Sequence, residues 1–177
     1  GAVDLNDPTN QFYEECAAWE GAHITDEALS INGFTREEIA DGSKKGEADL
    51  VASFVAWATD RPEDRTLAAQ NVSFDLEFVQ QACKRAGIEC PFGKRTLDVH
   101  TLTWLHMVQK GLTPPLLNNH SAINLDFALR YVGLPEEPRP HNGLTGALCH
   151  AEVIARIAYN RKIFPEFSEY DIPWHHE

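Results

Sequence analysis

Long apolar runs, paired cysteines and an excess of positive charge are all missing from this sequence. No stretch approaches the roughly 18 unbroken apolar residues of a membrane span, and no charged and apolar leader opens the chain. These absences predict a cytoplasmic protein with no membrane partner. The 177 residues are 43% hydrophobic and 24% charged, which excludes the disordered and fibrous classes. We expect one domain with a core of its own.

The cysteines are few and form no CxxC pair. Cys83 and Cys149 fall within helix-like patterns, where a reduced thiol packs as a small apolar group. Reduced thiols are therefore favoured over disulfides or zinc for all four, Cys16, Cys83, Cys90 and Cys149. A small zinc-stabilised domain is an alternative that would require clustered Cys and His ligands.

Positive charge is scarce, and the formal net charge is −12. Tight binding to a long duplex draws its free energy from phosphate neutralisation, so this charge argues against such a function. It does not exclude a nuclease that binds only the last few nucleotides through divalent cations, because carboxylates are the groups that hold those cations.

The chain does not begin with methionine, and its only methionine is Met107. Residues 1–5 already have the pattern of a strand. We therefore expect that a segment precedes Gly1.

Apolar spacing and turn residues predict a mixed β-sheet covered by helices, the α/β class. Turn formers at 6–10 separate strand-like runs at 1–5 and 11–16, which predicts a hairpin. Thr35 and Glu38 form a capping-box pattern that opens a short helix ending near Gly42. Further strands are expected at 66–70 and 95–99, and further helices at 48–58 (stopping at 60–62), 73–86 with Gly87 as C-cap, 101–109, 123–132 and 143–162. In the last helix the predicted buried stripe is Leu144, Ala147, Ala151, Ile154 and Ala158. Residues 1–164 are expected to form the domain, and 165–177 a tail packed on its surface.

A first candidate site lies at residues 69–78, AQNVSFDLEF. The predicted strand delivers Asn71, and Asp75 follows one turn into the next helix. A carboxylate at the end of a buried strand is fixed in position and open to a cleft, as a metal ligand must be. The alternative is an aspartate that only complements the helix dipole.

A second candidate lies at residues 140–153, PHNGLTGALCHAEV. His141 stands just before the last predicted helix, after a proline-rich loop. A histidine at such a junction reaches solvent and suits a general base that deprotonates water. The alternative is a surface histidine without a function.

In order and spacing, these two runs resemble the DEDDh 3′→5′ exonucleases of the RNase H-like fold. Residues 1–3, 31–35 and 97–98 resemble further segments of that family, so the resemblance covers nearly the whole chain. It implies an RNase H-like mixed sheet flanked by helices. It also implies a two-metal site of four carboxylates that binds Mg²⁺ or Mn²⁺, and a histidine that activates water.

Carried over residue by residue, the resemblance makes Asp75 the third carboxylate and His141 the general base. Asn71, Phe74 and Phe78 are in register and are candidate substrate contacts. Phe74 and Phe78 could stack on a terminal base, but core packing of at least Phe78 is the favoured interpretation. Two departures stand out. Gln70 occupies a position where the family has histidine, and the first two carboxylates would lie before Gly1.

The family's last carboxylate should stand at position 146, where this sequence has Gly146. His150 is four positions further on and faces nearly the same way on a helix, whereas Glu152 is turned away. We therefore expect His150 to replace the missing ligand, which would favour Mn²⁺ or Zn²⁺ over Mg²⁺. The alternative is that His150 packs or faces solvent.

The sequence thus predicts a metal-dependent 3′→5′ exonuclease acting on single-stranded DNA or RNA ends and releasing nucleoside monophosphates. The rival prediction is a degenerate nuclease fold that binds nucleic acid or a protein without cutting, which Gly146 and Gln70 favour. Retention of both Asp75 and His141 argues for the enzyme. A homodimer is an alternative to a monomeric protein.

Overall fold

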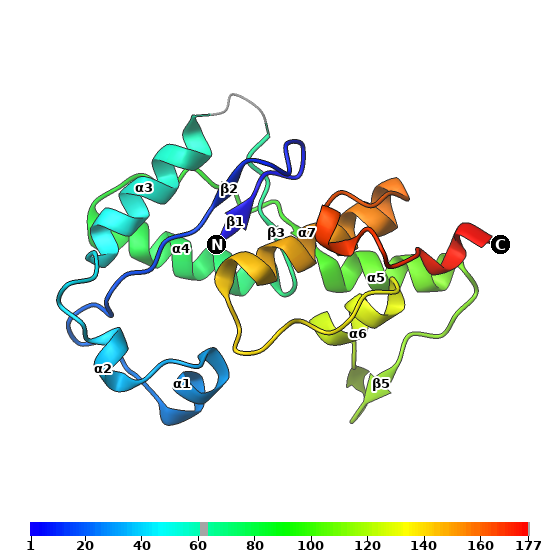
Figure 1. Cartoon of the computed structure of the whole chain (residues 1–177), viewed down its shortest axis with the longest axis horizontal. Helices are drawn as coiled ribbons and strands as arrows, with labels where there is room; N and C mark the ends of the chain where they lie inside the picture. The colour runs from blue at the N-terminus through cyan, green and yellow to red at the C-terminus, as the bar shows by residue number, and fades with distance from the viewer. Residues whose placement is uncertain (61–63, 177) are drawn as a thin grey trace.

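The computed structural model describes residues 1–60 and 64–176, in which helices surround short pairs of strands (Figure 1). The strands are β1 (Ala2–Val3), β2 (Gln11–Phe12), β3 (Ala68–Ala69), β4 (Leu97–Asp98), β5 (Leu116–Leu117) and β6 (His120–Ser121). The helices are α1 (Asp26–Asn32), α2 (Arg36–Ile39), α3 (Glu47–Thr59), α4 (Val72–Ala86), α5 (Val99–Gln109), α6 (Leu125–Tyr131) and α7 (Gly143–Tyr159), followed by the 3₁₀ turns Pro165–Phe167 and Pro173–His176. The α/β class expected from the sequence is confirmed. None of the described helices is both long and apolar enough to cross a bilayer.

The predicted N-terminal hairpin is confirmed. β1 and β2 pair antiparallel, with Ala2 opposite Phe12, and the amide of Asp4 donates to the carbonyl of Asn10 across the turn. The Phe12 ring lies 5.3 Å from that of Phe54 on α3, centroid to centroid, and β1 packs on α7. The hairpin is therefore anchored to two helices.

β3 and β4 confirm the two other predicted strands and pair in parallel, with Ala68 opposite Leu97. Parallel pairing puts both carboxyl ends at one edge, and α4 and α5 begin there. Within the described residues this pair and the hairpin are not hydrogen-bonded to each other. Helix α7 packs against β1 and β3, and so connects the two pairs.

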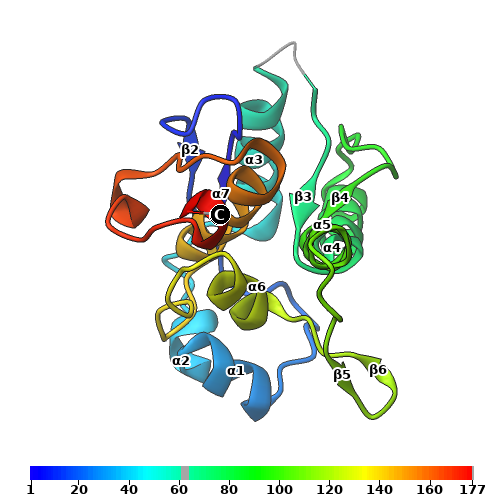
Figure 2. The ribbon, with the colours of Figure 1, turned by 90° about the vertical axis from the view of Figure 1, so that its right-hand side faces the viewer.

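The main core lies where α5, α6 and α7 meet (Figure 2). Its fully buried members include Val99, Ala128, Leu129, Val132 and Val153. Burying one such aliphatic side chain stabilises a fold by roughly 1.5–3 kcal/mol. This contact therefore fixes α7, and with it the segment that leads into α7.

Near its carboxyl end, α7 carries a fully buried ion pair between Glu152 and Arg156, with Nε 2.8 Å from Oε1. The other Glu152 oxygen accepts from the amides of Ile163 and Phe164. The Arg156 guanidinium donates to carbonyls beyond α7 and α6, those of Val132, Phe167, Tyr170 and Asp171. The pair ties the segment after residue 164 to α7, so Glu152 is engaged in structure and is not free to hold a metal.

Several boundaries differ from the prediction. Helix α7 ends at Tyr159, because Asn160 adopts a left-handed conformation, and Ala158 is exposed where a buried position was predicted. Asp60 caps α3, while Arg61 and Pro62 of the expected stop lie outside the described residues. The Thr35–Glu38 capping box is confirmed, although its helix already ends at Ile39.

Helix α1 and the β5–β6 hairpin were not predicted. Helix α1 has a Thr25 N-cap and a Gly33 C-cap but no buried residue, so it carries no apolar periodicity. The hairpin turns through Asn118 and Asn119, both at positive φ, and exposes its leucines. It projects from the rest of the molecule (Figure 2).

Candidate active site

Asp75 lies in the first turn of α4, just after β3. Asn71 adopts a left-handed conformation, φ 56°, and turns the chain from strand into helix. The Asp75 side chain is exposed. Partial loss of solvent nevertheless raises the pKa of its carboxyl above the usual value, and the negative charge of Asp98 acts in the same direction. Asp75 is thus available to a ligand and lies near a second carboxylate.

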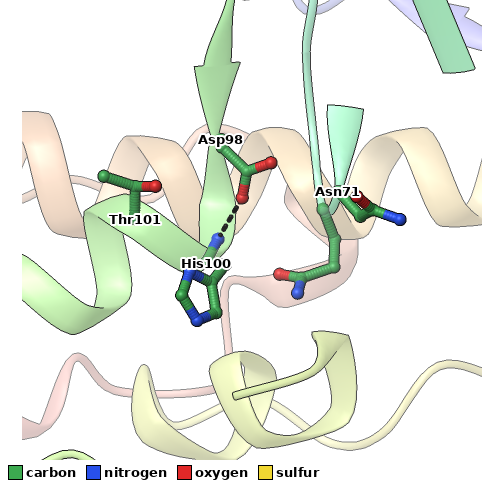
Figure 3. Close-up of a pocket in the computed structure, with 5 residues that line it drawn as sticks. Asn71, Asp98, His100 and Thr101 are labelled. Carbon is green, nitrogen blue, oxygen red and sulfur yellow. Dashed lines mark hydrogen bonds between the residues drawn. The ribbon is translucent and has the colours of Figure 1, made fainter. Parts of the chain in front are cut away.

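Asp98, at the end of β4, fixes the start of both neighbouring helices. Its Oδ2 accepts from the Val72 amide at 3.1 Å, and its Oδ1 accepts from the His100 amide at 2.8 Å (Figure 3). Negative charge at helix N-termini is stabilising. The position of Asp75 on α4 therefore depends on Asp98, which the sequence analysis had placed only in a strand.

A cavity of about 340 Å³ opens at this edge of the strand pair, lined by Gln70, Asn71, Asp98, His100 and Thr101 (Figure 3). Gln70 donates through Nε2 to the carbonyl of Ile123. Its buried Oε1 has no hydrogen-bond partner within the described chain. All five lining residues are polar, and one of them, Asn71, stands four positions before Asp75 in the chain. The cavity can therefore receive a polar part of a substrate.

His150, on α7, is partly buried, and its ring is close enough to Asp98 to be affected by that charge. Burial lowers the pKa of its imidazole to about 4, and the charge of Asp98 only partly opposes this. The ring is therefore neutral at pH 7, which is the form that ligates metals.

His141 directly precedes α7. The next residue, Asn142, caps the helix through Oδ1, which accepts from the amides of Leu144 and Thr145, and its Nδ2 donates to the Tyr13 hydroxyl at 2.9 Å. The His141 side chain is 27% exposed, and its Nδ1 lies 2.9 Å from Oε2 of Glu137. Its Nε2 makes no hydrogen bond to any described residue and is free to accept a proton.

Glu137 is a residue that the sequence analysis missed. Its side chain is only 8% exposed, and its Oε1 would lie 3.1 Å from a Cβ added to Gly146. No sequence signal identified it, because it stands four residues before His141 in a proline-rich loop and not on a helix, where that spacing is informative.

Gly1 connects Asp75 with the His141 segment. A Cβ on Gly1 would collide with the backbone of Gly143 and Leu144, so Gly1 lies against the first turn of α7. Gly1 also lies close to the carboxylate of Asp75. Asp75 and the start of α7 thus share one neighbour.

Phe74 and Phe78 lie side by side on the outer face of α4, with ring centroids 4.7 Å apart. They are 58% and 53% exposed. Core packing of Phe78, which the sequence analysis favoured, is therefore wrong. Two exposed rings next to Asp75 form a surface on which a base can stack.

No three His, Cys, Asp or Glu side chains of the described residues gather closely enough to hold a metal ion. Asp75 offers oxygen and His150 offers nitrogen, but these residues do not form a complete two-metal site by themselves. The four cysteines are free thiols.

Comparisons with curated proteins and with solved structures give no match. The model of the family RNase_T, described as Exonuclease, matches residues 7–154. This match spans most of the chain, including α4 with Asp75 and the first two-thirds of α7, and it agrees with the RNase H-like α/β class. The chain therefore belongs to the exonuclease family.

Proposed function

We propose that this member of the exonuclease family removes nucleotides one at a time from single-stranded 3′ ends and releases nucleoside monophosphates. The observation that supports this most directly is the shared neighbourhood of Gly1. Gly1 lies close to the Asp75 carboxylate, and the turn that follows His141 packs against Gly1. This common neighbour supports a site in which a carboxylate and a general base act together, as phosphodiester hydrolysis requires.

In this proposal His141 accepts a proton through Nε2 from the attacking water, and Asp75 lies on the other side of the scissile phosphate. Phe74 and Phe78 stack on the terminal bases, because their rings are exposed on the same helix as Asp75. Asn71, at the mouth of the polar cavity, contacts the sugar-phosphate backbone. With few positive side chains, the protein would hold only a short end of the strand.

The cofactor of this reaction would be Mg²⁺ or Mn²⁺, which supplies positive charge to the phosphate and lowers the pKa of bound water. Of the expected ligands, this sequence contains Asp75, with His150 in place of the aspartate that the family resemblance puts at 146. The resemblance assigns no residue of this sequence to the other two carboxylates of the family pattern.

A second candidate function is binding of single-stranded nucleic acid without cleavage. It is favoured by Gly146 and Gln70, which depart from the family pattern, and by the lack of a complete metal cluster among the described residues. The exposed Phe74–Phe78 pair would serve this function equally well.

A digestion assay separates the two. End-labelled single-stranded DNA and RNA are incubated with the protein in Mg²⁺ and in Mn²⁺, and the products are resolved by length. We expect stepwise shortening from the 3′ end, lowered about 10²–10⁴-fold by His141→Ala and abolished by Asp75→Asn. The control variants His120→Ala and Glu77→Gln change an exposed histidine and an exposed carboxylate outside the proposed site. Both should cleave like wild type. Binding without turnover in either metal would establish the second function.

A further inference from the structure

Three features of Glu137 are unusual for a loop glutamate. Its side chain is nearly buried, it bonds to the ring of His141, and its second oxygen occupies space beside a helical glycine. Its neighbour Glu136 is 58% exposed and pairs with the equally exposed Arg130. Only one of these two adjacent glutamates is therefore turned inward.

We propose that Glu137 is a positioning residue for His141, and that Gly146 is the opening into which its carboxylate fits. The proposal rests on the function proposed above, in which His141 is the general base.

The first step concerns the imidazole. A carboxylate only accepts hydrogen bonds, so Oε2 of Glu137 at 2.9 Å requires the proton of neutral His141 to sit on Nδ1. That leaves the lone pair on Nε2, the nitrogen without a described partner, to take a proton from water. A carboxylate that sets the tautomer and the ring orientation of a catalytic histidine is a recurrent arrangement.

The second step concerns Gly146. Glycine inside a helix is unfavourable compared with alanine, so its presence in α7 needs a reason. A Cβ at this position would lie 3.1 Å from Oε1 of Glu137, closer than an ordinary contact. An alanine here would require the carboxylate to move by a few tenths of an ångström, and a larger side chain would require more.

The charge of Glu137 also reaches the next turn of α7. Burial raises the pKa of the Cys149 thiol to about 12, and Glu137 is the first of the nearby carboxylates that raise it further. The Glu137 carboxylate is thus directed toward α7, at the position where Gly146 has no side chain, and not toward solvent.

The decisive measurement is the tautomer of His141, read from imidazole ¹⁵N shifts of the free chain and assigned with His141→Asn. We expect the Nδ1–H form in wild type and in the control Glu136→Gln. Glu137→Ala should shift the population toward Nε2–H, since no acceptor is left for Nδ1–H. An Nε2–H wild type, or a tautomer unaffected by Glu137→Ala, overturns the proposal whether or not the chain is active.

Kinetics test the consequence. Glu137→Ala should lower kcat about 100-fold, the scale seen for orienting partners of histidines, with KM changed less than about twofold because no substrate contact is lost. Gly146→Ala should raise the melting temperature and still lower kcat. In the Glu137→Ala background, Gly146→Ala should cost no further activity, because the carboxylate it displaces is gone.

The outcomes for the two proposals differ. Absence of turnover in a protein assayed with any residues that precede Gly1 refutes the exonuclease and leaves the tautomer measurement to decide the Glu137–His141 contact. An active chain in which Glu137→Ala retains full kcat, or in which the two substitutions are additive, refutes the role of Glu137 alone.

Discussion

Replacing Arg156 with methionine is expected to cost a large part of the stability of the protein. Arg156 is fully buried, and it donates to the Glu152 carboxylate and to four backbone carbonyls. Methionine has a similar length and would fill most of the volume. The substitution therefore removes the hydrogen bonds and the charge without opening a large cavity.

The expected magnitude follows from what remains behind. Breaking a buried ion pair by removing one partner costs about 3–5 kcal/mol, because the other charge is left uncompensated. Glu152 keeps two amide donors, from Ile163 and Phe164, which reduces that cost, while the orphaned carbonyls add to it. A loss of about 4 kcal/mol is a large share of a typical total of 5–15 kcal/mol. For a chain of this size it would lower the Tm by about 8–16 °C.

Urea unfolding followed by circular dichroism measures this loss. The control Arg161→Met changes an exposed arginine close to the end of α7 and should stay within about 0.5 kcal/mol of wild type. The double variant Glu152→Gln, Arg156→Met should be more stable than Arg156→Met alone, because the unpaired buried charge is gone. A loss below about 1 kcal/mol for Arg156→Met, or a double variant less stable than the single one, would refute the reasoning.

Three further predictions concern the candidate site. Burial lowers the pKa of His150 from 6.5 to about 4. As the pH falls from 6.5 to 4, the unfolded chain therefore binds a proton at this histidine before the folded chain does. Stability should then decline by up to about 3 kcal/mol between pH 6.5 and 4, and His150→Asn should flatten this decline in unfolding experiments. Gly33→Ala would force a Cβ against Pro140, the residue before His141, and should lower both stability and kcat. The control Gly87→Ala has a similar positive φ but an open surrounding, so it should lower stability only. Phe74→Ala should weaken single-strand binding about tenfold or more in a fluorescence titration, and unchanged affinity would exclude base stacking there.

Much of the fold was predictable because its signals are local. The hairpin was indicated by its turn formers, α4 by apolar steps of three and four, and the start of α2 by the Thr35–Glu38 capping box. Elements without a buried face were missed, since α1 and the β5–β6 hairpin carry no apolar pattern. Ala158 was assigned to the core by extending a stripe beyond the point where Asn160 ends the helix.

A candidate site residue could be proposed from the sequence only where it adjoins a recognisable element. Asp75 after β3 and His141 before α7 are of this kind. Asp98 and Glu137 are not, because their roles depend on contacts between segments distant in sequence or on the shape of a loop. Asp98 reaches the amide of Val72 from another strand, and no spacing rule in the sequence encodes that contact.

Gly146 shows how a departure from a family pattern depends on its surroundings. Taken from sequence alone, it is a lost metal ligand. In the fold, an aspartate at this position would bring a second carboxylate next to that of Glu137, whose Oε1 lies 3.1 Å from the position of the missing Cβ. Two carboxylates that share one site cannot both ionise readily. In a metal-free chain an aspartate at 146 would therefore have to share a proton with Glu137 or displace it, whereas glycine leaves room for the inward-facing carboxylate. The glycine and the glutamate are in this sense two parts of one arrangement.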